Sequence, residues 1–366
     1  MTFSGDEIFR QAISAMQARD VAAAEQAFRG VLELQPRHVG ALNLFTVLLI
    51  SLGRFEEAER YARLALNENA TSDVTLYNYA LILKALKRPA EALERFSQAL
   101  TINPSVASTW NNRGTVFNDL KRYNDAVSDF DRAIQLDPEY AEAFFNKGKS
   151  FTLLKRLDEA SSAFERALAL RPNLAEAWLG RGNVFCKRKQ YDDAFAAYER
   201  ALSLKAELAE GWLGRGNAFQ ELRRYQEALT AFERAAALKP DLVEAWIGCG
   251  EMLARLKRHE EAARAYAHVL ETDPQRPFMK GLLLHQKMSA CAWNGVDDLI
   301  AEIDQDVLSG KPAAEPFGWQ GVAKSPRSLQ RCAELFNAEK YPAKSGDSPR
   351  QSPRDRGKIR IGYASG

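Results

Sequence analysis

Residues 107–140 read ASTWNNRGTVFNDLKRYNDAVSDFDRAIQLDPEY, and the spacing of the small residues in this stretch decides the fold. Gly114 and Ala126 belong to two series that recur every 34 residues along the chain. The glycines are Gly114, Gly148, Gly182, Gly216 and Gly250, and the alanines are Ala58, Ala92, Ala126, Ala160, Ala194, Ala228 and Ala262. A period of this length is typical of stacked helix pairs, because one pair cannot bury its own apolar face. We therefore predict an all-α repeat array.

Large residues recur at fixed distances from these small ones. If Ala107 is position 1, position 4 holds Trp110, Phe144, Trp178, Trp212 and Trp246, position 24 holds Phe130, Phe164, Tyr198, Phe232 and Tyr266, and position 32 holds Pro104, Pro138, Pro172, Pro240 and Pro274. Proline cannot continue a helix, so position 32 marks the end of each second helix. Glycine inside a helix costs about 1 kcal/mol relative to alanine, so its recurrence at position 8 implies a contact without room for a side chain. We expect small residues at positions 8 and 20 to let two backbones approach, with aromatic residues filling the space between pairs.

This pattern resembles the tetratricopeptide repeat, which has Trp at position 4, Leu-Gly at 7 and 8, Tyr at 11, Ala at 20, Phe at 24, Ala at 27 and Pro at 32. Eight such repeats cover residues 5–276, namely 5–38, 39–72, 73–106, 107–140, 141–174, 175–208, 209–242 and 243–276. The first two repeats are degenerate: Thr46 replaces glycine, Ala62 replaces phenylalanine and Leu42 replaces tryptophan. The resemblance implies a right-handed superhelical solenoid in which the N-terminal repeats are looser or act as a cap.

In such arrays the first helices line a concave groove that binds proteins or extended peptides. The resemblance implies that positions 2, 5, 6, 9, 12 and 13 face this groove. Asparagines at positions 5, 6 and 9 are the candidate peptide-binding residues: Asn78, Asn111, Asn112, Asn146, Asn183 and Asn217. An amide both donates and accepts, so a row of amides can pair with any peptide backbone. The alternative is that these asparagines only cover a solvated helix face. At position 6, Gly180, Gly214 and Gly248 either widen the groove or permit closer stacking.

Two charged rows each allow two interpretations. Position 7 is basic at Arg113, Lys147, Arg181 and Arg215, and position 2 is acidic at Glu142, Glu176, Glu210 and Glu244. The basic row could bind an acidic ligand, or its stems could pack between helices while the charged heads reach water or a neighbouring glutamate. The acidic row could favour basic peptides, or it could complement the helix dipole from the first turn.

The pattern changes after the repeats. Residues 277–310 have apolar residues at helical spacing and predict a divergent capping helix pair. Residues 311–342 predict a proline-containing connector with a short helix, and residues 343–357 are polar and predict a flexible linker. The final stretch, KIRIGYASG at 358–366, alternates apolar and polar residues with the period of a strand.

Short segments in this region resemble the O-linked N-acetylglucosamine transferase family. In order, they are CAWNGVDDLIAEI at 291–303, EPFGW at 315–319, SPRSLQ at 325–330 and RIGYASG at 360–366. The resemblance implies a transition segment, a connector and the first strand of a truncated catalytic domain. The parent protein would then transfer GlcNAc from UDP-GlcNAc to serine or threonine, with this chain as its substrate-recognition arm. The family's catalytic residues would follow Gly366, so we assign no catalytic residue and expect this chain itself to be inactive. The alternative is a non-enzymatic adaptor or scaffold.

Composition bounds the remaining functions. The 366 residues carry a formal net charge of +2, which does not favour bulk attraction to nucleic acid or to an anionic membrane. The N-terminus carries Asp6 and Glu7 and lacks the apolar run of a secretory signal, so we expect a cytoplasmic protein. The four cysteines form no CxxC pair, and no phosphate-binding or HExxH motif is present, so we assign no metal-binding or cofactor-binding residue. The sequence does not predict an oligomeric state.

Overall fold

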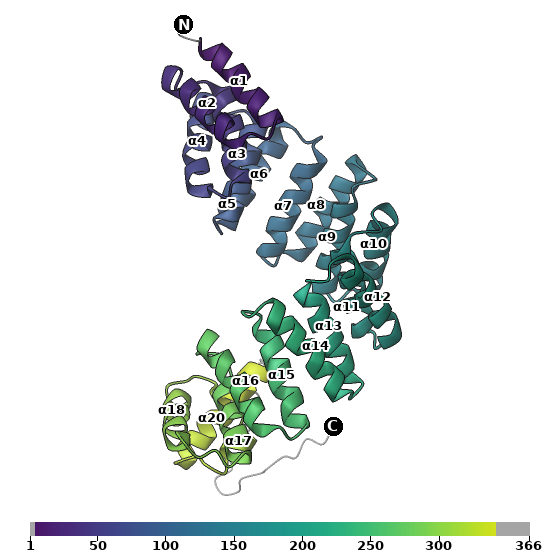
Figure 1. The fold of residues 1–366 in the computed structure, drawn as a ribbon, viewed down its shortest axis with the longest axis vertical. Helices are drawn as coiled ribbons and strands as arrows, with labels where there is room; N and C mark the ends of the chain where they lie inside the picture. Colours follow the sequence, from purple (N-terminus) through teal and green to yellow (C-terminus); the bar gives the residue numbers. More distant parts are fainter. Residues whose placement is uncertain (1–3, 342–366) are drawn as a thin grey trace, which may run out of the picture. The chain divides into compact units, whose positions relative to one another are not determined.

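The structure, a computed structural model, describes residues 4–341, and every regular element in that part of the chain is a helix (Figure 1). The chain divides into two compact units, Met1–Ala218 and Phe219–Gly366, which are described separately below. The strand-like segment 358–366 and the linker 343–357 lie outside the described residues. None of the helices within residues 4–341 combines the length and the apolar character needed to cross a membrane.

Within residues 4–218, the first unit contains twelve complete helices. They are α1 (Gly5–Gln17), α2 (Val21–Leu34), α3 (Val39–Ser51), α4 (Phe55–Glu68), α5 (Asp73–Ala85), α6 (Pro89–Ile102), α7 (Ala107–Asp119), α8 (Tyr123–Leu136), α9 (Ala141–Leu153), α10 (Leu157–Leu170), α11 (Ala175–Lys187) and α12 (Tyr191–Leu204). Helix α13 (Ala209–Glu221) spans the boundary between the units. The second unit contains α14 (Tyr225–Leu238), α15 (Val243–Arg255), α16 (His259–Thr272), α17 (Met279–Ser289), α18 (Val296–Leu308), α19 (Pro316–Trp319) and α20 (Pro326–Lys340).

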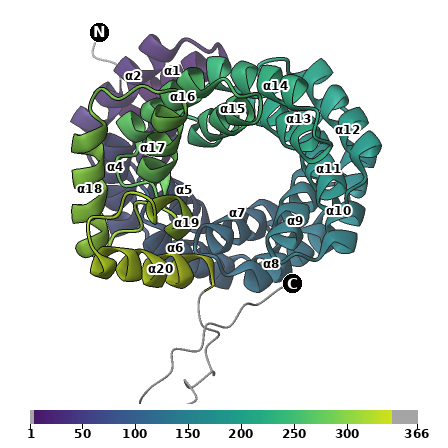
Figure 2. The ribbon, with the colours of Figure 1, turned by 90° about the horizontal axis from the view of Figure 1, so that it is seen from below.

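The helices of the first unit stack in consecutive pairs. Between α1 and α12, every two consecutive helices pack against each other. Consecutive first helices also contact each other directly, as α5 does with α7 and α7 does with α9. Within this unit, α7, α9 and α11 lie on the inner side of the curve, and α8, α10 and α12 lie on its outer side (Figure 2). The predicted all-α stack of helix pairs is therefore confirmed.

The recurring glycines are explained by an aromatic ring, which differs in part from the expectation above. A Cβ atom added at Gly148 would lie 2.8 Å from the Phe164 ring at position 24 of the same repeat. A Cβ atom at Gly180 would lie 2.5 Å from the same ring, approached from the next repeat. Tyr198 is placed in the same way between Gly182 and Gly214. The glycine at position 8 thus makes room for a ring rather than for a second backbone, and the glycine at position 6 permits closer stacking.

Consecutive repeats are also joined through the tryptophans at position 4. The indole Nε1 of Trp178 donates to the carbonyl oxygen of Pro172, the last proline of the preceding repeat, over 2.9 Å. The same bond recurs from Trp110, Trp212 and Trp246 to the carbonyl at position 32 of the preceding repeat. A buried or half-buried indole N–H needs such an acceptor, so position 4 supplies both apolar area and a directional link.

The turn within each repeat has one fixed backbone form. Lys121 has a φ of +59°, its N–H donates to Asn118, and the N–H of Arg122 donates back to Phe117. These two bonds are the Schellman motif, which satisfies the last carbonyls of the first helix. The left-handed residue recurs every 34 residues, at Arg19, Gly53, Lys87, Lys121, Lys155, Lys189, Arg223 and Lys257.

The first two repeats replace consensus contacts with others. Thr46, at position 8, is fully buried, and its hydroxyl donates to the carbonyl of Leu42 over 2.7 Å. Glu25 accepts hydrogen bonds from Arg29 and Arg54, and these bonds lower the pKa of its carboxyl group. Phe28 and Phe45 stack with ring centroids 5.8 Å apart in one apolar core.

In the second unit, α17 to α20 form a separate apolar core beside the last helix pair. Trp319 is buried, and its Nε1 donates to the Ser328 hydroxyl over 3.1 Å. The Cys332 thiol donates to the carbonyl of Ala314 over 3.1 Å, and burial raises the pKa of this thiol to about 11. These contacts hold residues 314–319 against α20.

Candidate peptide-binding surface

The candidate surface is the inner face of the first unit, defined here as the surface formed by positions 5, 6, 9 and 12 on α5, α7, α9 and α11. These helices contact each other in sequence, so their side chains meet across consecutive repeats. Helix axes pack about 8–10 Å apart, and an extended peptide advances about 3.3 Å per residue, so one repeat corresponds to about three peptide residues.

Two of the predicted asparagines bind each other. Asn111 on α7 and Asn146 on α9 are 1% and 7% exposed, and the Nδ2 of Asn146 donates to the Oδ1 of Asn111 over 3.0 Å. Burial raises the pKa of the nearby Tyr140 phenol to about 12. Ser150 and Asn118 form a second bond between α9 and α7 at 2.8 Å. This pair of asparagines therefore links two repeats.

The other four predicted asparagines lie in different environments. The Nδ2 of Asn112 donates to the Tyr77 hydroxyl over 2.8 Å, and the Oδ1 of Asn183 accepts from the Tyr198 hydroxyl over 2.8 Å. Asn217 is exposed. Asn78 is 6% exposed, and its Nδ2 has no hydrogen-bond partner among the described residues.

The structure thus pairs Asn111 with Asn146 and gives the other predicted residues different environments. The six asparagines do not form one uniform row, because several amides are engaged by tyrosines or by each other. Their role in peptide binding stays a prediction.

A further cluster on this face, formed by Lys84 and Thr115, was not predicted from the sequence. Lys84 on α5 donates from Nζ to the Thr115 hydroxyl on α7, and Thr115 in turn donates to the carbonyl of Asn112. Burial lowers the pKa of the Lys84 ammonium, an effect that Asp119 and Glu142 partly oppose at longer range. Lys84 is at position 12 and Thr115 at position 9, and both positions were expected to face the groove. Neither residue type recurs at its position along the chain, so the repeat pattern did not reveal them.

The basic row at position 7 is held by carboxylates of the second helices. Arg113 donates two bonds of 2.7 Å to Asp129, and Lys147 pairs with Asp131 at 2.6 Å. The guanidinium of Arg113 also lies 4.8 Å from the centre of the Trp110 ring. Burial raises the pKa of Asp129, and the hydrogen bonds from Arg113 oppose this effect. These contacts support the interpretation that the stems at position 7 are packed and the heads are ion-paired.

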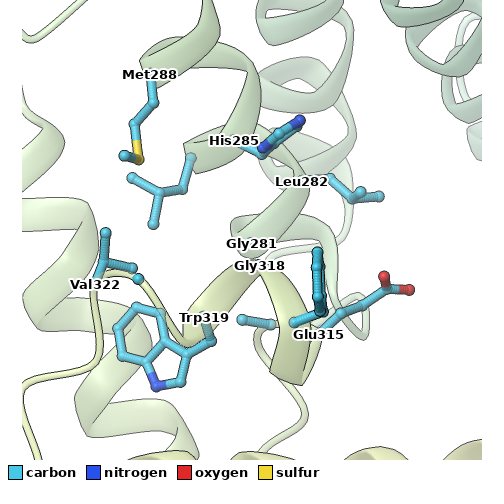
Figure 3. Close-up of a pocket in the computed structure, with 12 residues that line it drawn as sticks. Gly281, Leu282, His285, Met288, Glu315, Gly318, Trp319 and Val322 are labelled. Carbon is cyan, nitrogen blue, oxygen red and sulfur yellow. The ribbon is translucent and has the colours of Figure 1, made fainter.

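The second unit contains an apolar cavity of about 330 Å³ between α17 and the α19 region. Figure 3 shows Met288, Val322 and Trp319 on one side of this cavity and His285 and Glu315 on the other. Phe317 also lines it and is 91% exposed. No predicted peptide-binding residue lines this cavity.

Comparisons with known proteins identify the repeats. Tetratricopeptide repeat profiles match residues 15–81, 74–106, 107–140, 141–174 and 213–277, and a profile described as TPR repeat matches residues 182–222. A search of the curated proteins finds no match.

Solved structures share the fold at low sequence identity. The APC/C hetero-tetramer Cut9–Hcn1 matches with 17% identity and a TM-score of 0.60 over 77% of this chain and 56% of that chain, so the chain spans little more than half of that relative. A tetratricopeptide repeat protein from Parabacteroides merdae matches with 17% identity and a TM-score of 0.57, over 68% of this chain and 98% of that one. Pseudomonas aeruginosa pilF matches with 23% identity and a TM-score of 0.52, over 59% of this chain and 97% of that one. The repeat profiles and the stacked helix pairs together establish that this chain is a tetratricopeptide repeat protein.

Proposed function

We propose that the chain is a protein-interaction module whose inner face in the first unit binds an extended segment of a partner protein. The observation that carries this proposal is the set of hydrogen-bonding side chains that cross from one first helix to the next, including Tyr77 with Asn112 and Asn111 with Asn146. Such bonds hold amides and hydroxyls in place before a ligand arrives, which reduces the entropy lost on binding.

The amides and hydroxyls suit a peptide backbone better than they suit a nucleic acid or a membrane. An amide or hydroxyl that is accessible on this face can donate to a peptide carbonyl or accept from a peptide N–H regardless of the peptide's side chains. Helices α5 to α11 cover three inter-repeat steps, which corresponds to about nine or ten extended peptide residues. A dodecapeptide is therefore long enough to occupy the face.

Blocking the face with one large side chain tests the proposal. Thr152 on α9 and Ser162 on α10 belong to the same repeat, and among residues 4–341 the hydroxyl of each bonds only to a carbonyl of its own helix. Peptides are selected from a random dodecapeptide library on the full chain, and their binding is measured by fluorescence anisotropy. Thr152→Trp, on the inner helix, is expected to weaken binding at least tenfold. Ser162→Trp, on the outer helix, is expected to leave it unchanged.

These two variants are cleaner probes than replacing the asparagines. Asn146→Ala would leave the buried Oδ1 of Asn111 without its donor, which costs about 1–3 kcal/mol in folding and confuses binding with stability. Equal binding by both tryptophan variants would place the peptide elsewhere. Failure to select any peptide from the library would remove the proposed function.

A more specific proposal is that this module is the substrate-recognition arm of a cytoplasmic protein similar to O-linked N-acetylglucosamine transferase. Its support is the sequence resemblance of the short segments between 291 and 366 alone. The reading frame after Gly366 tests it: a continuation of two hundred or more residues that alternates strands and helices would support the transferase, and a stop codon would favour the adaptor.

A further inference from the structure

Lys84 differs from Lys280, Arg113 and Lys147, three other half-buried basic residues, which are all paired with carboxylates. Lys280, on α17, forms ion pairs with Glu302 and Asp306 at 3.1 and 2.8 Å. Arg113 and Lys147 are paired as set out above. Within residues 4–341, the only bond of the Lys84 ammonium is to the neutral Thr115 hydroxyl, and no carboxylate reaches ion-pair distance.

The Lys84 ammonium lacks partners that would offset the free-energy cost of burying its charge. Burying a charge is costly unless a partner of opposite charge or several hydrogen bonds replace its hydration. An ammonium has three N–H groups, and Thr115 accepts one of them. Asp119 and Glu142 act on Lys84 only at longer range, and Lys149 adds a second positive charge from α9.

A second unsatisfied donor lies on the same helix. Asn78 precedes Lys84 by six residues, which is about 9 Å along α5. Its Nδ2 is buried and has no partner among the described residues. The Asn78 nitrogen is buried beyond the reach of a surface ligand, so Lys84 is the donor to which a ligand over α5 would supply an acceptor oxygen.

We propose that Lys84 holds a carboxylate of the bound peptide, which makes the inner face selective for acidic segments. This inference rests on the proposed peptide-binding function and adds a ligand class to it. The carboxylate can come from an aspartate or glutamate side chain or from a free C-terminus, and both would accept charge-assisted hydrogen bonds from the ammonium.

Library selection on the full chain and three variants tests the inference. Dodecapeptides displayed without a free C-terminus are selected on the wild-type chain, on Lys84→Met, on Lys84→Glu and on the control Lys155→Met. Lys155 is an exposed lysine in the turn between α9 and α10, so its loss changes the net charge by the same amount away from the inner face. Aspartate and glutamate should be enriched by the wild-type chain and by Lys155→Met. Lys84→Met should lose this preference, and Lys84→Glu should replace it with a preference for lysine and arginine.

Synthetic peptides then separate the two sources of carboxylate. For one selected peptide with an amidated C-terminus, Glu→Gln should weaken binding to the wild-type chain about tenfold and binding to Lys84→Met less than twofold. If the Gln peptide regains affinity when its C-terminus is left free, the terminal carboxylate can also occupy the site. Circular dichroism melts confirm that each variant is folded.

The outcomes distinguish this inference from the function on which it rests. Peptides that bind with no acidic preference, or whose preference survives Lys84→Met and Lys84→Glu, would overturn the role of Lys84 and leave the proposed function standing. A wild-type chain that selects no peptides would overturn both.

Discussion

At the residue scale, the aromatic ring at position 24 explains glycines at two other positions. Phe164 lies between Gly148 of its own repeat and Gly180 of the next, and a Cβ atom at either glycine would come within 3.0 Å of the ring. The ring is fully buried, so it cannot swing toward solvent to make room. One aromatic residue therefore fixes both the pairing within a repeat and the stacking between repeats.

Gly148→Ala is expected to destabilise the protein by about 0–2 kcal/mol, because overpacking costs about 1–3 kcal/mol while the helix gains about 1 kcal/mol of propensity. Gly30→Ala on α2 is the matched control, since its Cβ would meet only Ile8, at an ordinary 3.7 Å. We expect this control to stabilise the protein by about 0.5–1 kcal/mol. Urea unfolding followed by circular dichroism measures both. Equal effects of the two substitutions would contradict the role assigned to the ring.

For the asparagines, the sequence predicted their positions but not their hydrogen-bond partners. Their positions on the first helices could be predicted from the repeat, because helical spacing assigns each position to a face. Their partners could not, since the direction of an amide depends on side-chain rotamers and on the exact neighbours across the repeat. Asn111 and Asn146 bind each other, whereas Asn217 is exposed, although all three were predicted to share one role.

At the element scale, the turn inside most repeats places a residue with a side chain in the left-handed conformation that favours glycine. Its left-handed position carries lysine or arginine in seven repeats and glycine only at Gly53. A side chain in the left-handed region costs about 1–2 kcal/mol relative to the right-handed region, whereas glycine adopts it freely. The Schellman bonds offset this cost by satisfying the last carbonyls of the first helix.

Lys121→Gly is therefore expected to raise the free energy of unfolding by about 1 kcal/mol, reduced somewhat by the greater freedom of glycine in the unfolded chain. Gly53→Ala should lower it by a similar amount, because its φ is +70° and nothing lies within 4 Å of the added Cβ atom. The pair isolates backbone conformation from packing. Thermal melts that move in the same direction for both variants would rule out this explanation.

The first two repeats show how elements form without the consensus residues. Sequence reasoning predicted that they are looser or act as a cap, because Thr46 replaces glycine and Ala62 replaces phenylalanine. In the structure, the Thr46 hydroxyl bonds within its own helix, and Phe28 and Phe45 form the core instead. Substitutions at consensus positions could be seen in the sequence, but the contacts that replace them could not.

At the scale of the whole molecule, the 34-residue period carried most of the prediction. Each of the eight predicted repeat ranges begins at the first residue of an odd-numbered helix, from Gly5 to Val243. This was possible because the same contacts recur, so one repeat informs all the others. Less of the segment after the repeats could be predicted. Its helices were expected from apolar spacing, but the cavity beside Trp319 depends on contacts that occur only once along the chain.

Photo-crosslinking on the full chain tests the central claim, that the inner face of the first unit binds extended peptides, most directly. A benzophenone amino acid is placed at Thr152 on α9 or at Ser162 on α10, and each protein is irradiated with a dodecapeptide selected on the wild-type chain. The account predicts a crosslinked product from position 152 that unlabelled peptide competes away, and none from position 162. Crosslinking at position 162 alone, or equally at both positions, would contradict it.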